Sequence, residues 1–228
     1  MELPLLHLAL VGTPNSGKTS LFNALTGSRQ KVANYPGVTV EKKTGRVVTP
    51  AGRPLDVVDL PGTYSLRARS PDEEITRDAV LGKLSSEHAP DLIVCVADAS
   101  NLRLALRLAL ELKQVGRPVL MSLNMMDIAK KRGIDIDLDV LSRELGIPVV
   151  ASVAVRRGGI DRLMQALDER LDRLEPAGAA DWRAPDASAL RNAQREADRV
   201  LRAAIRNAGT LDPGTAKADK LVLHPVGG

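Results

Sequence analysis

Short apolar runs alternate with amphipathic stretches along most of this chain. The apolar runs lie at 5–11, 92–97 and 119–123, and stretches with helical spacing of apolar residues follow them at 17–26, 102–112 and 139–145. Apolar runs of this length fit buried strands, and the stretches between them provide helical crossover connections. The pattern predicts an α/β fold with a mostly parallel sheet and helices on both of its faces.

Three more strands and one helix complete the predicted sheet. Residues 41–49 and 54–59 flank the turn-forming pair Ala51-Gly52, so we expect a hairpin that adds one antiparallel strand. Residues 148–151 have the pattern of a last short strand, and residues 160–174 that of the helix closing the sheet. The sequence therefore predicts one sheet of six strands.

The composition changes near residue 175. Residues 175–180 combine proline and glycine with alanine, which is typical of a linker. Helical spacing of small and apolar residues returns over 187–208, at Leu190, Ala193, Ala197, Val200, Leu201, Ala204 and Ile205. We predict a domain over 1–175, then a linker and a short helical appendage over 176–228, whose apolar face must pack on something.

Composition narrows the possible functions. With 44% hydrophobic and 26% charged residues the chain fits an ordinary soluble domain, and 2% aromatics leaves little material for stacking on nucleic-acid bases. Cys95 is the single cysteine, which excludes an intramolecular disulfide and favours a reducing compartment. Because no apolar run approaches a membrane span and no signal peptide is visible, we expect this chain alone to be soluble and cytoplasmic.

The strongest chemical motif is a phosphate-binding loop. Residues 12–19 match its pattern, Gly-x-x-x-x-Gly-Lys-Thr, and lie between a predicted strand and a predicted helix, as that motif requires. Backbone N–H groups would wrap a phosphate chain, Lys18 would reach its terminal phosphates and Thr19 would ligate magnesium. The predicted nucleotide-binding residues of this segment are Gly12, Asn15, Ser16, Gly17, Lys18, Thr19 and Ser20.

A second motif indicates which base is bound. Asn124-Met125-Met126-Asp127 follows a predicted strand, and the Asp127 carboxylate there can accept hydrogen bonds from guanine N1–H and the exocyclic amino group. Adenine offers no such donor pair, and Asn124 would brace the surrounding loops. The sequence therefore predicts GTP and GDP as ligands, with Met125 beside the base.

Two further segments would sense the γ-phosphate. Asp59 ends a predicted strand and can hold magnesium through water, while the Gly62 N–H three residues later can meet the γ-phosphate. In the loop over 34–41, Thr39 offers a hydroxyl that could complete the magnesium shell when GTP is present. Ordering of this loop by GTP, and its release after hydrolysis, would be a switch.

These motifs, in this order, resemble the translation-factor branch of the Ras-like P-loop GTPases. More closely, the chain is similar to the N-terminal cytosolic domain of the ferrous iron transport protein B family, on residues 12–20, 34–42, 59–66 and 124–127, and again at 219–228. The resemblance implies a GTP-binding, slowly GTP-hydrolysing switch domain of a bacterial ferrous-iron transporter at the cytoplasmic face of the inner membrane. It implies a membrane region after Gly228 and small accessory transport proteins as partners. A homo-oligomer is a further possible partner, and the low aromatic content argues against nucleic acid.

The resemblance also assigns roles. It implies that Asn15 ligates an activating potassium ion, so the catalytic set is Lys18, Asn15, Thr39 and Gly62. The family's guanine loop usually has Ser followed by Thr or Ala, whereas this chain has Val153-Ala154-Val155. Ala154 would keep a backbone contact, but the hydroxyl support is lost, which predicts faster nucleotide release. No glutamine follows Gly62, which predicts slow intrinsic hydrolysis.

Two other functions fit the motifs. One is a regulatory module in which nucleotide occupancy alone gates the channel, and the other is a ribosome- or tRNA-associated GTPase, against which the absence of an RNA-binding appendage argues. We assign no iron site, since His7, His88 and His224 are scattered and apolar packing explains the methionines at 121, 125 and 126.

Overall fold

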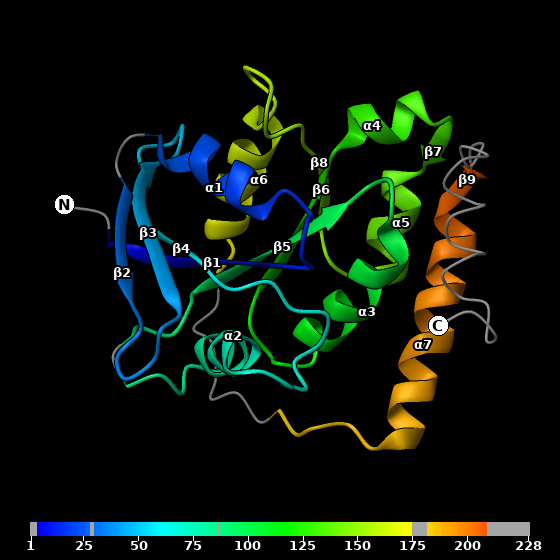
Figure 1. Ribbon diagram of the computed structural model, residues 1–228. Coiled ribbons are helices and arrows are strands. Elements are labelled where there is room, and N and C mark those ends of the chain that lie inside the picture. The colour runs from blue at the N-terminus through cyan, green and yellow to red at the C-terminus, as the bar shows by residue number, and fades with distance from the viewer. Residues whose placement is uncertain (1–3, 28–29, 86, 175–181, 209–228) are drawn as a thin grey trace, which may run out of the picture.

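Residues 4–27, 30–85, 87–174 and 182–208 are described in the computed structural model (Figure 1). Within them, one sheet of seven strands has the order β2-β3-β4-β1-β5-β6-β8, and β7 and β9 form a separate pair. The strands are β1 Leu6–Gly12, β2 Gln30–Asn34, β3 Glu41–Val48, β4 Pro54–Asp59, β5 Leu92–Asp98, β6 Val119–Asn124, β7 Ile134–Ile136, β8 Val149–Ala151 and β9 Ile205–Ala208.

The main sheet is mostly parallel, as predicted. β4, β1, β5, β6 and β8 run parallel, and β3 joins β4 as the expected antiparallel hairpin. The predicted count of six strands is wrong by one, because β2 pairs antiparallel with β3 at the sheet edge. Four of its five residues are exposed, so its sequence carries no burial pattern from which a strand could be predicted.

Helices cover both faces of the main sheet (Figure 1). They are α1 Lys18–Thr26, α2 Pro71–Leu81, α3 Leu102–Lys113, α4 Met126–Lys131, α5 Leu138–Leu145, α6 Asp161–Leu171 and α7 Ala187–Ala204. One buried cluster joins Leu8 and Leu10 to α1 and α6, and the other joins Ala9 and Val11 to α2, α3 and α5. This split follows from the two-residue period of a strand, which sends alternate side chains to opposite faces.

The central strand β5 is apolar along its length because both of its faces are covered. Its first six residues are fully or almost fully buried, Cys95 among them. Burial raises the pKa of the Cys95 thiol to about 12, since the charged thiolate is poorly solvated there. Cys95 is therefore a small core residue and not a reactive nucleophile.

The appendage helix α7 packs against α3 and α5. Ala197, Val200 and Ala204 are completely buried on its inner face, and Trp182 packs on the same cluster. The expectation of a helix through residue 208 is wrong, because α7 ends at Ala204 and the chain continues as β9 against β7. The Asp137 N–H donates to the Ala204 carbonyl at 2.8 Å, which satisfies the helix end where strand pairing begins.

Candidate functional site

The phosphate-binding loop lies between β1 and α1, at the carboxyl edge of the parallel strands. It opens on a cavity of about 360 Å³ lined by Thr13, Pro14, Asn15, Gly17, Lys18, Thr19, Ser20 and Gly62. Asn15 and Gly17 have positive φ angles of 64° and 78°, which turn the backbone around this space. The loop has the concave form that a phosphate chain requires.

Two glycines of the loop are required by close contacts. A Cβ atom on Gly12 would lie 2.5 Å from the Val96 carbonyl oxygen of β5. On Gly17 it would lie 2.3 Å from Asn124 Nδ2, at a backbone conformation that side chains rarely adopt. The predicted glycine positions therefore allow the loop to pack tightly against two neighbouring strands.

Asp59 contacts both polar side chains that begin α1. Its carboxylate forms an ion pair with Lys18, and Thr19 Oγ1 donates to Asp59 Oδ2 at 3.0 Å. The three side chains come from β4 and α1 and meet beside the cavity, with Asp59 only 7% exposed. A hydroxyl and a carboxylate side by side are hard oxygen donors, so this pair fits a magnesium ion.

Asn124 ties the phosphate-binding loop to the loop after β8. Its side chain is 2% exposed. Nδ2 donates to the Ser16 carbonyl at 3.1 Å, and Oδ1 accepts from the Ala154 N–H at 3.0 Å. Asn124 thus connects the two loops, as expected from the sequence. The Ala154 N–H is one of the groups that it binds.

A second cavity, of about 580 Å³, lies beside the Asn-x-x-Asp loop. Its lining residues are Met126, Asp127, Lys130, Gly133, Ile134, Asp135, Ile136, Val153 and Arg156. Asp127 and Val153, both predicted at the base, line this space, and Met125 before them has a positive φ of 60° that turns the chain into α4. The cavity has the size that a nucleoside base requires.

Arg156 was not predicted at this site. Its Nη2 atom lies 3.5 Å from Asp127 Oδ2, and the arginine side chain is 60% exposed. The sequence shows two adjacent arginines, Arg156 and Arg157, in a loop whose course it does not reveal. Charge alone therefore could not identify which of them approaches the carboxylate.

Thr39 makes no hydrogen bond to Thr19 or Asp59 in the described part of the chain. It is exposed on the turn between β2 and β3, which is closed by hydrogen bonds from the Tyr35 N–H to the Val40 carbonyl at 3.0 Å and from the Val38 N–H to the Tyr35 carbonyl at 3.3 Å. Tyr35, at 3% exposure, is the buried anchor of this turn. Burial raises the pKa of its hydroxyl, and the nearby carboxylates of Glu87 and Asp59 raise it further.

Gly62 lies at the mouth of the phosphate cavity. A Cβ atom there would come 3.2 Å from the backbone nitrogen of Pro14, so the segment after β4 passes close to the phosphate-binding loop. The Thr63 N–H donates to the Gly12 carbonyl at 3.0 Å, which fixes this approach. Gly62 is therefore held at the rim of the cavity, next to the phosphate-binding loop.

Two of the three histidines lie side by side. The rings of His7 and His88 stack with centroids 4.4 Å apart, although they are distant in sequence, and His224 lies outside the described residues. Among the described residues, no group of three or more histidines, cysteines and carboxylates could hold a metal ion. Met121 is fully buried in the core.

Parallel strands that carry a phosphate-binding loop after the first strand and a base-reading loop after a later one define the class of P-loop guanine-nucleotide-binding domains. The chain belongs to the family described as "Ferrous iron transport protein B", whose sequence model matches residues 6–167. It is 47% identical over 163 residues to the Fe(2+) transporter FeoB of Salmonella typhimurium, an alignment covering 72% of this chain. That alignment covers 21% of the transporter, so this chain spans about a fifth of its length.

Solved structures of the same family are similar. The cytosolic domain of the T. maritima FeoB iron transporter in its GDP form superposes with a TM-score of 0.77 at 29% identity, over 90% of this chain and 100% of that one. Its GMPPNP form gives a TM-score of 0.75, over 89% and 100% of the two chains. The predicted family and the α/β fold are confirmed.

No helix in the described part of the chain is both long enough and apolar enough to cross a bilayer.

Proposed function

We propose that this chain binds GTP and hydrolyses it slowly, as the cytosolic switch domain of a bacterial ferrous-iron membrane transporter. The observation that carries the proposal is the cluster of Lys18, Thr19 and Asp59 at the mouth of the phosphate cavity. Family membership supports it, since relatives are Fe(2+) transporters and a relative's cytosolic domain has GDP and GMPPNP forms.

Nucleotide phosphates would bind through the loop backbone and Lys18. Residues of this loop line the cavity, so its backbone N–H groups could meet phosphate oxygens, and Lys18 would exchange its ion pair with Asp59 for the terminal phosphates. Thr19 directly, Asp59 through water and Thr39 would hold magnesium, which supplies positive charge to neutralise the phosphates. Thr39 would join this set by a movement of its exposed turn.

The base would lie between the Asn-x-x-Asp loop and the loop after β8. Asp127 would accept the two guanine donors, with Val153 and Ala154 at the opposite edge and Met125 beside the ring. Asn124 supports both loops through its two hydrogen bonds. The loop after β8 has Val153 and Ala154 where the family resemblance implies a residue with a hydroxyl group. The lost hydroxyl contact would favour rapid release of nucleotide.

Slow hydrolysis follows from the residues after Gly62. The Thr63 hydroxyl is buried and donates to the Ser65 carbonyl at 2.6 Å, so it cannot orient an attacking water. Tyr64 is 47% exposed and carries no amide. Catalysis would therefore depend on Lys18 and the Gly62 N–H, which would contact the γ-phosphate, and on Thr39. A potassium ion held by Asn15 would add positive charge. The Asn15 side chain makes no hydrogen bond to a described residue.

The nucleotide state would act on other parts of the transporter. We place the GTP-binding domain at 1–175, with 176–228 leading to a membrane-embedded region of the same protein at the cytoplasmic face of the inner membrane. Small accessory transport proteins and further copies of the chain are the other proposed partners. A module gated by occupancy alone is the second candidate, favoured by the buried Thr63 hydroxyl, because slow turnover suits a signal carried by the bound state.

The potassium role can be tested by GTP hydrolysis with magnesium in potassium and in sodium at equal ionic strength. We expect wild type to be faster in potassium by about tenfold or more, because a fixed cation stabilises the charge of the transition state. Asn15→Ala should lose this difference, and Asn192→Ala, on the exposed face of α7, should keep it. Equal wild-type rates in the two salts would remove the potassium role of Asn15.

A further inference from the structure

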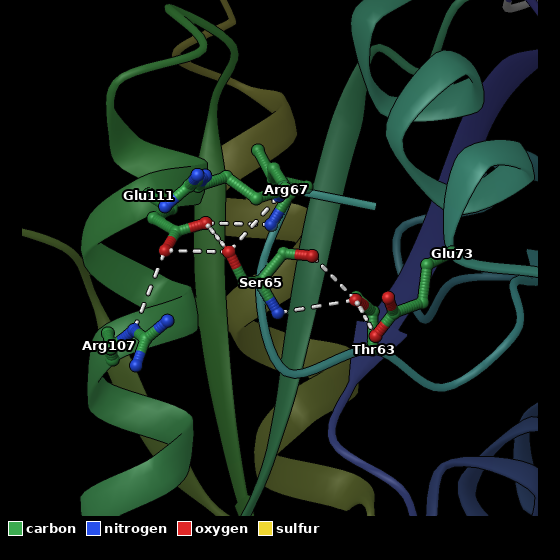
Figure 2. A network of polar contacts seen from close by, with 7 residues as sticks. Thr63, Ser65, Arg67, Glu73, Arg107 and Glu111 are labelled. Atoms are coloured by element: carbon green, nitrogen blue, oxygen red, sulfur yellow. Dashed lines mark hydrogen bonds and ion pairs between the residues drawn. The ribbon is translucent and has the colours of Figure 1, made fainter. Parts of the chain in front are cut away.

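A buried glutamate on α3 holds the segment that follows Gly62 (Figure 2). Glu111 is 2% exposed. Its Oε2 atom accepts from the Leu66 N–H at 2.7 Å and from Ser65 Oγ at 2.8 Å, and its Oε1 lies 3.0 Å from the same hydroxyl. Ser65 Oγ in turn accepts from the Arg67 N–H at 3.1 Å, so three successive residues depend on this one carboxyl group.

The segment is also fixed at its other end. The Thr63 N–H donates to the Gly12 carbonyl of the phosphate-binding loop at 3.0 Å, and the Ser65 N–H donates to Thr63 Oγ1 at 3.2 Å. Leu66 is fully buried in the core. The backbone from Gly62 to Leu66 is therefore held between the phosphate-binding loop and α3, with Gly62 one residue from the first contact.

α2 contacts the same segment from the opposite side, as Figure 2 shows. Glu73 Oε1 lies 3.3 Å from Thr63 Oγ1, and Glu73 Oε2 accepts from the Arg69 N–H at 2.8 Å. Arg107 is one helical turn before Glu111, with its Nε 3.7 Å from Glu111 Oε1, which balances the buried charge. The contacts to Glu111 thus form the only buried acidic anchor of this segment among the described residues.

Burying a carboxylate on an apolar helix face has a large desolvation cost. α3 is rich in leucine, and an apolar residue at position 111 would pack there without any desolvation cost. A buried polar contact of this sort fixes one arrangement among several that apolar packing would allow. The arrangement fixed here is the conformation of the backbone that carries Gly62.

We propose that Glu111 is a positioning residue for GTP hydrolysis, which acts through Ser65 and Leu66 to hold the Gly62 N–H at the γ-phosphate position. The proposal rests on the GTPase function proposed above. Among the described residues, the groups that would bind GDP make no hydrogen bond or ion pair with Glu111, because they are the phosphate-binding loop and the loops of Asn124 and Asp127, whereas Glu111 contacts Ser65, Leu66 and Arg107. Loss of Glu111 should therefore affect turnover of GTP and leave GDP binding in place.

The test compares Glu111→Met, Glu111→Gln and the control Arg103→Gln in the 228-residue chain. Met fills the space without an acceptor, so we expect kcat for GTP to fall between about 10-fold and 100-fold while the Kd for GDP changes less than about twofold. Gln keeps one acceptor oxygen and should lose less kcat than Met. Arg103→Gln removes an α3 contact to Asp198 of α7 and should leave kcat unchanged.

A second variant keeps the test valid if Glu111→Met does not fold. Ser65→Ala removes the hydroxyl that bridges to Glu111 and lies in a loop, so it should lower kcat in the same direction, again without weakening GDP binding. Wild-type kcat in a folded Glu111→Met or Ser65→Ala protein overturns the inference, as does a parallel loss of GDP affinity. If wild type itself does not hydrolyse GTP, the proposed function fails instead.

Discussion

At the scale of single residues, two carboxylates organise the site. Asp59 holds Lys18 and Thr19 together at the phosphate cavity, and Asp127 faces the second cavity with Arg156 close by. Each contact supplies a buried or half-buried acid with a partner. In the proposed function each contact would also be exchanged or shared when a nucleotide enters, since phosphate would compete for Lys18 and guanine for Asp127.

The competition at Asp127 gives a testable prediction. Arg156→Ala should tighten GDP binding by up to about fivefold at low salt, because an exposed ion pair worth up to about 1 kcal/mol no longer competes with guanine. High salt should remove the difference between variant and wild type, since it screens the pair. GDP titrations at two salt concentrations measure both effects.

The matched control is Arg157→Ala, which removes the same charge one residue further along the loop. No ion pair of Arg157 is present among the described residues, so its GDP affinity should stay close to wild type. Weaker GDP binding by Arg156→Ala would mean that Arg156 assists the base and would contradict this account.

Motif residues could be predicted because their chemistry is tied to local spacing. Gly12, Asp59 and Asn124 end the buried strands β1, β4 and β6, and Gly17 and Lys18 lie at the start of α1, in the positions that the motifs indicate. Glu111 and Arg156 could not be predicted, because their contacts depend on how distant segments cross. A glutamate three residues after the buried Leu108 of α3 is the one available signal, and many surface helices show the same spacing.

At the scale of elements, the helix α7 and the strand β9 join the appendage to the nucleotide-binding fold. Arg103 of α3 pairs with Asp198, and Arg199 of α7 pairs with Glu144 of α5 at 2.5 Å. The helix itself follows from its apolar spacing. The sequence does not show that α7 packs on α3 and α5, nor that β9 pairs with β7. Strands of three and four residues carry too little pattern to be recognised in a sequence.

The packing of α7 predicts one cooperative unit. Val200→Ala should lower the free energy of unfolding by roughly 1–3 kcal/mol, because it leaves a cavity where a fully buried side chain packs. Urea unfolding followed by far-UV circular dichroism and by fluorescence of Trp182, the single tryptophan, should show coincident transitions.

The control for that measurement is Arg202→Ala, on the exposed side of the same helix, which should change the unfolding free energy by less than about 0.5 kcal/mol. A Trp182 transition well below the circular dichroism transition would mean that the appendage unfolds separately from the sheet.

At the scale of the whole molecule, the sheet topology brings the loops of the site together. Parallel strands place the loops after β1, β4, β6 and β8 at one edge, where the two cavities lie. Helices on both faces keep those strands buried. The β2–β3 turn with exposed Thr39 lies beyond the carboxyl end of β4, because Lys43 near the start of β3 pairs with Asp59. A buried sheet with an exposed turn beside the site is an arrangement suited to a nucleotide-controlled switch.

The central claim is that this domain recognises guanine and hydrolyses GTP. The most direct test compares the rates of phosphate release from GTP and from ATP in the presence of magnesium. Wild type, Asp127→Ala and the control Asp139→Ala, an exposed acid of α5, would be compared. We predict a preference for GTP on the order of 100-fold in wild type and the control, and its loss in Asp127→Ala. Equal release from GTP and ATP by wild type, or an unchanged preference in Asp127→Ala, would contradict the account.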